Sequence, residues 1–342
     1  MLALLILFLV QPAMAQQPRN ITLQDALDMA VQNNAGLKSS SISVEQSKAL
    51  IKTGYSLDRP VVYYNLDENN LPPVGDALRV WGIQQQFTFP TVYGKQRLAL
   101  KGAYEVQEKQ FELDNRKLAQ EVSRAYYEVV YWQHLQRYYI SLDSVYTDFA
   151  RAAARRYQLG ETNYLEKLTA DTKKQEAQLQ VNQTQASIDA AYASLKHWLQ
   201  TDEPLVISET TLIPVTSGDT EVQNHPGLLY YEQLKQYAEF NSQLERNKLL
   251  PDIHFTYFQG RNAAENDKLY QGVNVGLGIP LWYGAQRANI KSAQLNVQRT
   301  EQLATDYQSA LTTAHERLLR ERDKYQQALD FYNTSGKLLA DE

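Results

Sequence analysis

The feature that most constrains this chain is an internal repeat. The segment "FPTVYGKQR" (Phe89–Arg97) returns 190 residues later as "IPLWYGAQR" (Ile279–Arg287), with five of nine positions identical. Upstream of this segment, Pro60 corresponds to Pro251, and the offset there is 191 residues. A nearly fixed offset over such a length indicates two copies of one structural unit rather than two unrelated domains.

The two copies are expected to differ in length. The first copy spans residues 16–222, whereas the second spans residues 223–342 and stops at Glu342, the counterpart of Ala152. The part of the first copy that follows Ala152 therefore has no counterpart in the second. We accordingly expect this chain to be a fragment of a gene product that is longer by about 50 to 100 residues, judged from the repeat offset.

Each copy contains a predicted pair of β-strands, at about residues 60–67 and 80–90 in the first copy and 251–260 and 270–280 in the second. The second strand of each pair alternates between apolar residues and small or polar residues, which is the period of a strand with two different faces. Gln85 is the exception. The apolar positions are Trp81, Ile83, Phe87, Phe89, Val273, Val275, Leu277 and Ile279.

This alternation has two interpretations. The strands are either half-buried in a soluble sheet, which is the commoner case, or part of a β-barrel that crosses an outer membrane. About nine to eleven tilted residues are enough for such a crossing, and the opposite face then lines a polar lumen. The polar face carries Gly, Gln, Asn and Thr rather than charged residues, which favours the barrel. In that interpretation the eight apolar residues face lipid.

Long helices are predicted after the strands. No proline lies between Pro90 and Pro204, so we expect a helical hairpin over about residues 91–200, with a turn at Gly160. In the second copy a long helix is expected over about residues 281–342. Apolar residues recur at steps of three and four, which predicts a coiled-coil seam. These residues are Leu118, Val122, Ala125, Val129, Trp132, Leu135, Tyr138, Leu142, Val145, Phe149 and Ala152.

The N-terminal 15 residues are typical of a secretory signal peptide. The apolar run Leu2–Val10 precedes Ala13-Met14-Ala15, a small-x-small cleavage pattern, although no Lys or Arg stands before the run. A short buried strand or helix of a cytosolic domain is the alternative. The run has nine residues and the mean hydropathy of the chain is −0.50. Because a membrane helix needs about 20 apolar residues, a polytopic helical membrane protein is excluded.

The composition also argues against several kinds of chemistry. The net charge is −5 and basic residues do not cluster, so nucleic acid is not expected as a partner. The chain has no Cys, and its five His residues are scattered along the sequence. We therefore expect no catalytic, cofactor-binding or metal-binding residues and no enzymatic activity.

The order of these features resembles the outer-membrane efflux family, the TolC-type exit ducts. Three segments carry the resemblance: Ile21–Ser40 with its counterpart His225–Leu234, the duplicated strand-to-helix junction, and "RYQLGETNYLEKL" (Arg156–Leu168) at the helical turn. The resemblance implies a mainly α fold with long antiparallel coiled-coil hairpins and four barrel strands per protomer. Three protomers would share one β-barrel that continues into a helical tunnel in the periplasm.

The resemblance also implies a function. The chain would be the passive outer-membrane exit duct of a tripartite efflux system, receiving drugs or heavy-metal cations from an inner-membrane pump, of the resistance-nodulation-division type, through a periplasmic adaptor protein. The alternative is a periplasmic adaptor or a coiled-coil scaffold, although adaptors carry one hairpin between β-rich domains. In the duct, the adaptor-contact tip comprises Arg156, Tyr157, Leu159, Gly160 and Glu161. The barrel-to-tunnel junction comprises Pro90, Tyr93, Gly94, Pro280, Tyr283 and Gly284.

Overall fold

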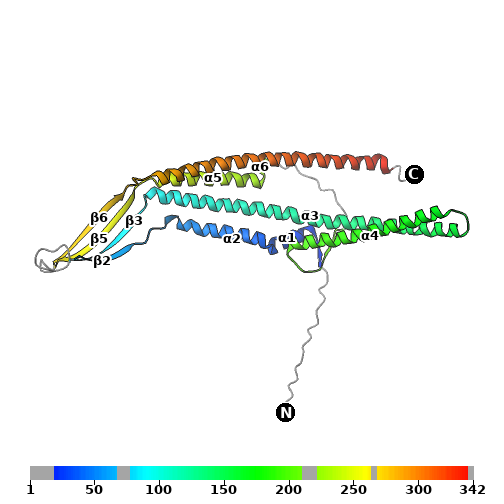
Figure 1. Ribbon diagram of the computed structural model, residues 1–342, viewed down its shortest axis with the longest axis horizontal. Coiled ribbons are helices and arrows are strands. Elements are labelled where there is room, and N and C mark those ends of the chain that lie inside the picture. The colour runs from blue at the N-terminus through cyan, green and yellow to red at the C-terminus, as the bar shows by residue number, and fades with distance from the viewer. Residues whose placement is uncertain (1–18, 68–77, 210–221, 263–267, 338–342) are drawn as a thin grey trace, which may run out of the picture. The chain divides into compact units, whose positions relative to one another are not determined.

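The computed structural model describes residues 19–67, 78–209, 222–262 and 268–337, and within them it is mainly α-helical (Figure 1). The predicted fold class is confirmed, since long helices accompany an antiparallel four-stranded sheet. The predicted signal peptide, residues 1–15, lies outside the described residues. None of the helices in the described ranges has both the length and the apolar character needed to cross a membrane.

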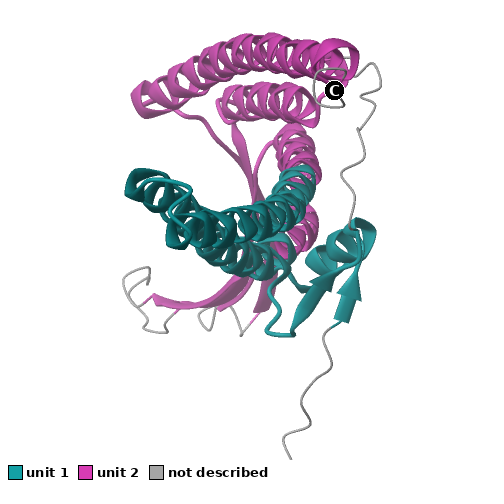
Figure 2. Ribbon diagram, turned by 90° about the vertical axis from the view of Figure 1, so that its right-hand side faces the viewer, with its two compact units in different colours: residues 1–39, 114–217 teal, residues 40–113, 218–342 magenta. Residues whose placement is uncertain are grey.

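The chain forms two compact units (Figure 2). Unit 1 comprises residues 1–39 and 114–217, and unit 2 comprises residues 40–113 and 218–342. The units cut across the two sequence copies, because the long helix α3 (Pro90–Gln158) contributes its first part to unit 2 and the remainder to unit 1. The duplication seen in the sequence therefore stays a prediction about how the chain arose.

Unit 1 begins with strand β1 (Arg19–Ile21), which pairs in parallel with β4 (Leu205–Ile207). Helix α1 (Leu23–Asn33) starts at a capping box, in which Asp25 N donates to Thr22 Oγ1 over 3.2 Å and Thr22 N donates to Asp25 Oδ2 over 2.9 Å. These bonds satisfy two donors that a helix start otherwise leaves open. The pairing of β1 with β4 was not predicted from the sequence.

The helical hairpin of unit 1 consists of α3 from residue 114 onward and α4 (Tyr164–Leu199), which lie side by side and antiparallel (Figure 1). Gln136 Nε2 donates to Gln185 Oε1 over 2.7 Å, and Gln133 Nε2 donates to the Tyr192 hydroxyl over 3.0 Å. These polar contacts fix the register of the two helices. The whole of α3 together with α4 covers residues 90–199, and the hairpin was expected over about residues 91–200.

The first half of the predicted seam is buried and the second half is partly wrong. Leu118, Val122, Ala125 and Val129 are buried, but Tyr138, Val145 and Phe149 are exposed in this chain. Towards the turn, Ala150 and Ala153 of α3 pack with Ala170 of α4 instead. Small residues allow two helix backbones to approach closely, so the contact follows the alanines rather than the larger apolar residues. The exposed residues are then free to serve another surface.

Unit 2 contains most of α2 (Ala35–Leu50), the 3-10 turn η1 (Ile51–Tyr55), and the helices α5 (Pro226–Asn247) and α6 (Gly284–Phe331). A π-helical turn, η4 (Tyr332–Gly336), follows α6. Helices α5 and α6 pack along their lengths near the sheet, and Lys235 Nζ forms an ion pair with Glu301 Oε1 at 2.9 Å. Both side chains are partly exposed to solvent, so this ion pair contributes little to the stability of the fold.

The four-stranded sheet belongs to unit 2 and consists of β2 (Val61–Asp67), β3 (Leu78–Phe87), β5 (Asp252–Asn262) and β6 (Lys268–Gly278). Its order is β2-β3-β5-β6, and all neighbours are antiparallel. The central pair thus joins a strand of the first copy to a strand of the second. Strands β2 and β6 form the two edges of the sheet.

Candidate membrane-facing sheet and helical tip

The register of the sheet collects its large apolar side chains on one face. Val62 lies opposite Ile83, Ile83 opposite Tyr257, and Tyr257 opposite Val273. Because successive residues of a strand point to opposite faces, the residues two positions along form further rows on the same face. These rows are Phe255–Val275 and Phe87–Ile253–Leu277. Six of the eight predicted positions therefore share one face with apolar residues of β2 and β5. Phe89 and Ile279 lie beyond the strands, and the expectation that Phe89 faces lipid is wrong, because its ring packs against Val92, Ala99 and Leu244.

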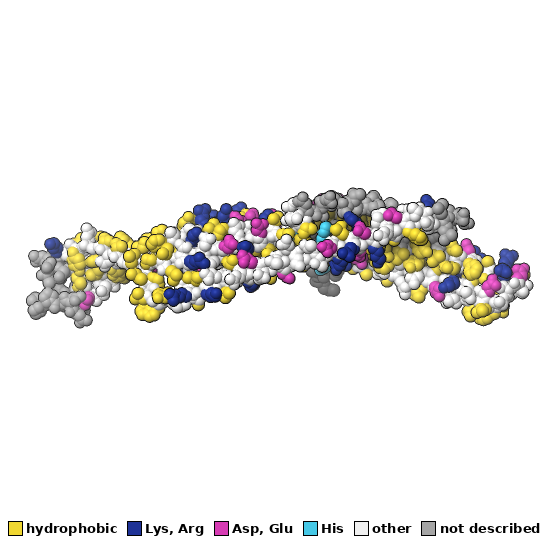
Figure 3. Space-filling model, turned by 90° about the horizontal axis from the view of Figure 1, so that it is seen from above, with side chains coloured by type: hydrophobic (Ala, Val, Ile, Leu, Met, Phe, Trp, Pro, Cys, Tyr) yellow, Lys and Arg dark blue, Asp and Glu magenta, His cyan; other side chains and the backbone are white. Residues whose placement is uncertain are grey.

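This apolar face is open to the surroundings of the chain. Val62 is 72% exposed and Val275 is 71% exposed, and Trp81, Leu277 and Ile279 are also exposed. Figure 3 shows hydrophobic side chains gathered over the strands, whereas most charged side chains lie over the helices. A contiguous apolar patch of this kind is unfavourable in water and marks a surface that contacts another apolar phase or a partner.

The opposite face of the sheet is built from small, polar and aromatic residues. One row runs Tyr63, Gly82, Phe258, Gly272 across the four strands. A Cβ placed on Gly82 would lie 2.6 Å from the Tyr63 ring, so the ring occupies the space that the glycine leaves. Further rows on this face contain Gln84, Thr256 and Asn274, and Gln86 Nε2 donates to Asp252 Oδ2 over 3.2 Å.

The first junction between sheet and helix is well packed. Pro90 is the first residue of α3, where its missing N–H has no cost. Val92 is buried with Ala99 and Leu244, and the Thr88 N–H donates to the Tyr93 hydroxyl over 3.1 Å. Gly94 lies in the first turns of the same helix. The structure thus places Pro90, Tyr93 and Gly94 in the first turns of α3, directly after β3.

The second junction differs from the expected geometry. Helix α6 begins at Gly284 with Tyr283 as its N-cap, so Pro280 precedes the helix instead of opening it. The physical reason is a lack of packing: Trp282, the counterpart of the buried Val92, is 91% exposed. Because this contact is missing, α6 lacks the helical turn with which α3 begins directly at its proline.

The second junction is held by polar contacts of repeated residues. Gln286 Nε2 donates to the Glu245 carbonyl over 2.7 Å and to its carboxylate over 2.9 Å. Burial raises the pKa of Glu245, but hydrogen bonds from Lys248 and Gln286 outweigh it and hold this pKa below its usual value. The Arg287 guanidinium lies 4.2 Å from the centre of the Tyr283 ring, a cation–π contact.

The tip of the hairpin is a short, tightly bonded turn. Gly160 has φ +74°, a left-handed conformation that glycine adopts without strain. The Glu166 N–H donates to Asn163 Oδ1 over 2.9 Å, which caps α4. Arg156 Nη1 lies 3.3 Å from Glu166 Oε1 and the Arg156 guanidinium 4.0 Å from the Glu161 carboxylate. Ion pairs and the cap therefore give the turn a defined conformation.

Apolar side chains project from this turn. Leu159 is 67% exposed, and Leu165 and Tyr157 are exposed beside it. The Tyr157 and Tyr164 rings meet edge to face with their centres 5.9 Å apart. The five predicted tip residues thus lie together, and Leu165 and Tyr164 extend the same surface from the start of α4.

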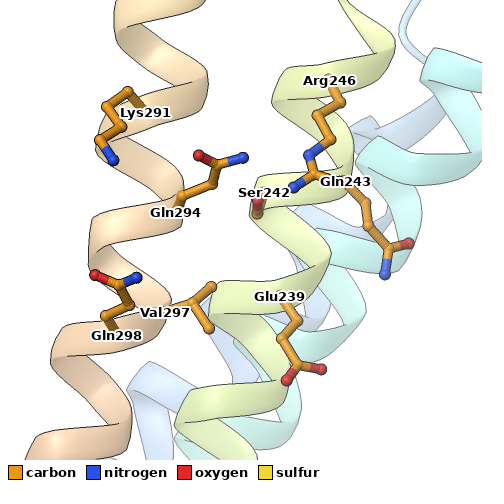
Figure 4. Close-up of a pocket in the computed structure, with 8 residues that line it drawn as sticks. All are labelled: Glu239, Ser242, Gln243, Arg246, Lys291, Gln294, Val297 and Gln298. Atoms are coloured by element: carbon orange, nitrogen blue, oxygen red, sulfur yellow. The ribbon is translucent and has the colours of Figure 1, made fainter.

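A polar groove of about 400 Å³ lies between α5 and α6 (Figure 4). Gln294 of α6 points across it towards Ser242 and Arg246 of α5. Ligand pockets are usually apolar with a few placed polar groups, and this groove has the opposite character. Across the described ranges, no three His, Asp or Glu side chains gather closely enough to hold a metal ion.

Known proteins resemble this chain in structure but not detectably in sequence. No family model matches the sequence, and no curated protein matches it. Solved structures do match over nearly the whole chain. CusC, described for its transmembrane channel formation, has a TM-score of 0.74 at 16% identity, covering 97% of this chain and 85% of its own. This chain has the fold of the outer-membrane channels.

Two further outer-membrane channel structures share the fold. The outer-membrane protein VceC of Vibrio cholerae has a TM-score of 0.69 at 13% identity, covering 93% of this chain and 85% of its own. The CmeC outer-membrane channel of Campylobacter jejuni has a TM-score of 0.65 at 15% identity, covering 92% of this chain and 77% of its own. Because the identities are low and the coverage is high, the fold depends on the pattern of apolar and polar residues rather than on particular residues.

Sequence reasoning missed part of the apolar face in this outer-membrane channel fold. Val62, Ile253, Phe255 and Tyr257 belong to it, but only β3 and β6 were expected to contribute. Strand β5 alternates in the same way from Ile253 to Tyr257, which would have identified its residues, whereas Val61–Tyr64 of β2 is a continuous apolar run whose faces the sequence does not separate. Trp282 was also missed, although an aromatic residue beside a strand end is a usual sign of a membrane interface.

Proposed function

We propose that this chain forms the passive outer-membrane exit duct of a tripartite efflux system, with most of its mass in the periplasm. The observation that carries the proposal is the sheet with one exposed apolar face and one polar face. Lipid on the apolar side and water on the other side would satisfy both faces at once. Such a duct moves its cargo, a drug or a metal cation, without catalytic groups.

The functional assembly would be a homotrimer. Strands β2 and β6 are edge strands, and the open backbone groups of an edge are not tolerated in lipid. Three copies would join these edges and close one twelve-stranded barrel. The exposed residues Tyr138, Val145 and Phe149 of α3 support the same assembly, because helices of neighbouring copies would cover them.

Partners of the duct would be a periplasmic adaptor protein and an inner-membrane pump of the resistance-nodulation-division type. The tip offers the adaptor an exposed apolar surface on a rigid turn, with Leu159 and Tyr157 as its main contacts. The charged residues Arg156 and Glu161 surround this surface. An apolar centre with a polar rim is the usual composition of a protein interface.

Membrane fractionation of cells that produce the natural full-length protein tests the membrane part of this proposal. We expect the protein in the outer membrane and its extraction only by detergent. Recovery with the inner membrane would instead indicate a periplasmic adaptor, and recovery in the soluble fraction would indicate a scaffold. Either result would overturn the proposed function.

The tip is tested by exchanging Leu159→Asp, with Gln178→Asp on the exposed side of α4 as the control that adds the same charge. We expect Leu159→Asp to abolish efflux by weakening adaptor binding, while the amount of protein in the outer membrane stays normal. Gly160→Arg should have the same effect. Wild-type efflux by the Leu159→Asp variant would remove the tip assignment.

A further inference from the structure

Two arginines face each other on the apolar face of the sheet. Arg79 of β3 lies directly opposite Arg261 of β5, and both side chains are exposed. Leu66 and Leu269 occupy the same row on the neighbouring strands. Two like charges directly opposite each other on a sheet destabilise the strand pairing. This end of the face, next to the row that holds Trp81, Gln259 and Gln271, thus carries two guanidinium groups.

The arginines border a hollow suited to a small anion. Its volume is about 290 Å³, and its lining includes Tyr64, Trp81 and Leu269 besides the two arginines. A guanidinium donates two parallel hydrogen bonds to a phosphate, and this geometry makes Arg the preferred residue for phosphate recognition. A phosphate between Arg79 and Arg261 would offset the repulsion between their charges.

The position of the hollow identifies the source of the phosphate. Helices α3, α5 and α6 adjoin the sheet at Phe87, Asp252 and Gly278, whereas the arginines lie at the opposite strand ends. If the helices are periplasmic, these ends reach the outer leaflet. From Ile279 to Leu269 the strand covers roughly 34 Å at 3.4 Å per residue, or about 24 Å of bilayer at a 45° tilt. That is the height of an outward-facing apolar band, so the hollow lies at headgroup level.

We propose that Arg79 and Arg261 bind the phosphate of an anionic outer-leaflet lipid whose acyl chains cover the apolar face below. The inference rests on the proposed membrane location. The Trp81 and Tyr64 rings, directly below the arginines, lie where aromatic residues meet headgroups in transmembrane barrels. Acyl chains would contact the next row, which contains Val62, Ile83 and Val273.

The test is lipid selectivity of the natural full-length protein reconstituted in vesicles of phosphatidylethanolamine with a minor fraction of lipid A, a phosphorylated glycolipid. Lipids that stay bound after purification are counted by native mass spectrometry. We expect the wild type to retain lipid A above its share of the vesicle, and R79Q/R261Q to lose at least about tenfold of that enrichment. The control R317Q/R320Q removes the same charge from exposed positions of α6 and should keep the enrichment.

Further variants and controls distinguish a wrong lipid site from a wrong proposed function. R79K/R261K keeps the charge but not the paired geometry, so its enrichment should fall between those of the wild type and R79Q/R261Q. Excess inorganic phosphate should leave the lipid bound; if it displaces the lipid, the site reads free phosphate and the proposal is overturned. If the wild type inserts into the phosphatidylethanolamine vesicles but does not enrich lipid A, this inference alone is overturned. Failure to insert into any vesicle overturns the proposed function as well.

Discussion

The helical hairpin of unit 1 and the sheet of unit 2 distribute their apolar side chains in opposite ways. In the hairpin, Val122 and Leu195 are fully buried, and the small residues Ala150, Ala153 and Ala170 form the contact near the tip. In the sheet, Val62 and Val275 are among the most exposed side chains. The hairpin thus buries its apolar side chains away from water, whereas the sheet presents them to an apolar surrounding. Of these two regions, only the hairpin is therefore stabilised by hydrophobic burial within a single chain.

The largest expected effect concerns the buried side of this comparison. Leu195→Ala removes a fully buried side chain and leaves a cavity, which should lower the free energy of unfolding of unit 1 by about 2–5 kcal/mol. Leu179→Ala on the same helix is the control, since Leu179 is 53% exposed. Urea titration followed by circular dichroism measures both. Equal effects of the two changes would contradict the assignment of the helix core.

The next effect concerns the exposed side. Val275→Arg places a charge on the apolar face and should cost about 2–4 kcal/mol in vesicles if the residue lies near the bilayer midplane. Asn274→Arg, one position away on the polar face, should cost much less. Unfolding of the reconstituted protein in urea measures the difference. A soluble sheet would tolerate the arginine at Val275 at least as well as at Asn274.

A smaller effect separates tight and open positions on the polar face of the sheet. In Gly82→Ala the new methyl would lie 2.6 Å from the Tyr63 ring and 2.8 Å from the Tyr257 carbonyl oxygen, and overpacking of this kind costs about 1–3 kcal/mol. At Gly276 the nearest atom would be 3.8 Å away, so Gly276→Ala is the control. The same urea titration applies. Equal stability of the two variants would show that the ring does not occupy the space over Gly82.

The smallest effect is a pH dependence in unit 1. The backbone hydrogen bond from Thr22 lowers the pKa of Asp25 below 3.8, its ordinary value. A lowered carboxyl pKa contributes stability that is present above the ordinary value and is lost as the pH falls through the lowered pKa. Wild type and Asp25→Asn should therefore melt more alike as the pH falls below about 4. Asp28→Asn serves as the control, and a difference that stays constant down to acidic pH would contradict the capping box.

Much of the fold could be predicted because its signals are local. Pro90 and Gly160 mark where a helix starts and turns, and alternation of apolar with small or polar residues, broken at Gln85, marked β3 and β6. The unpredicted parts depend on contacts distant in sequence. Strands β1 and β4 have three residues each, too few for a periodic pattern, and the pairing of β3 with β5 joins the two copies.

The candidate site was predictable to a similar degree. The tip residues lie together because they are neighbours in sequence, whereas the pairing of Arg79 with Arg261 needs the register of the sheet. The periodicity selected Ala152, which is exposed, whereas the helices meet at Ala150 and Ala153; small residues carry too weak a periodic signal to identify the right positions. The late start of α6 reflects the exposed Trp282, whose surroundings the sequence does not specify.

The central claim is that one face of the sheet meets lipid and the other meets water. Spin labels at Val275 and Asn274 in reconstituted protein test it directly, through collisions with oxygen, which concentrates in the bilayer, and with a water-soluble nickel chelate. The account predicts that oxygen reaches the label at Val275 and the chelate reaches the label at Asn274. Access of the chelate to Val275, with oxygen favoured at Asn274 or at neither position, would contradict it.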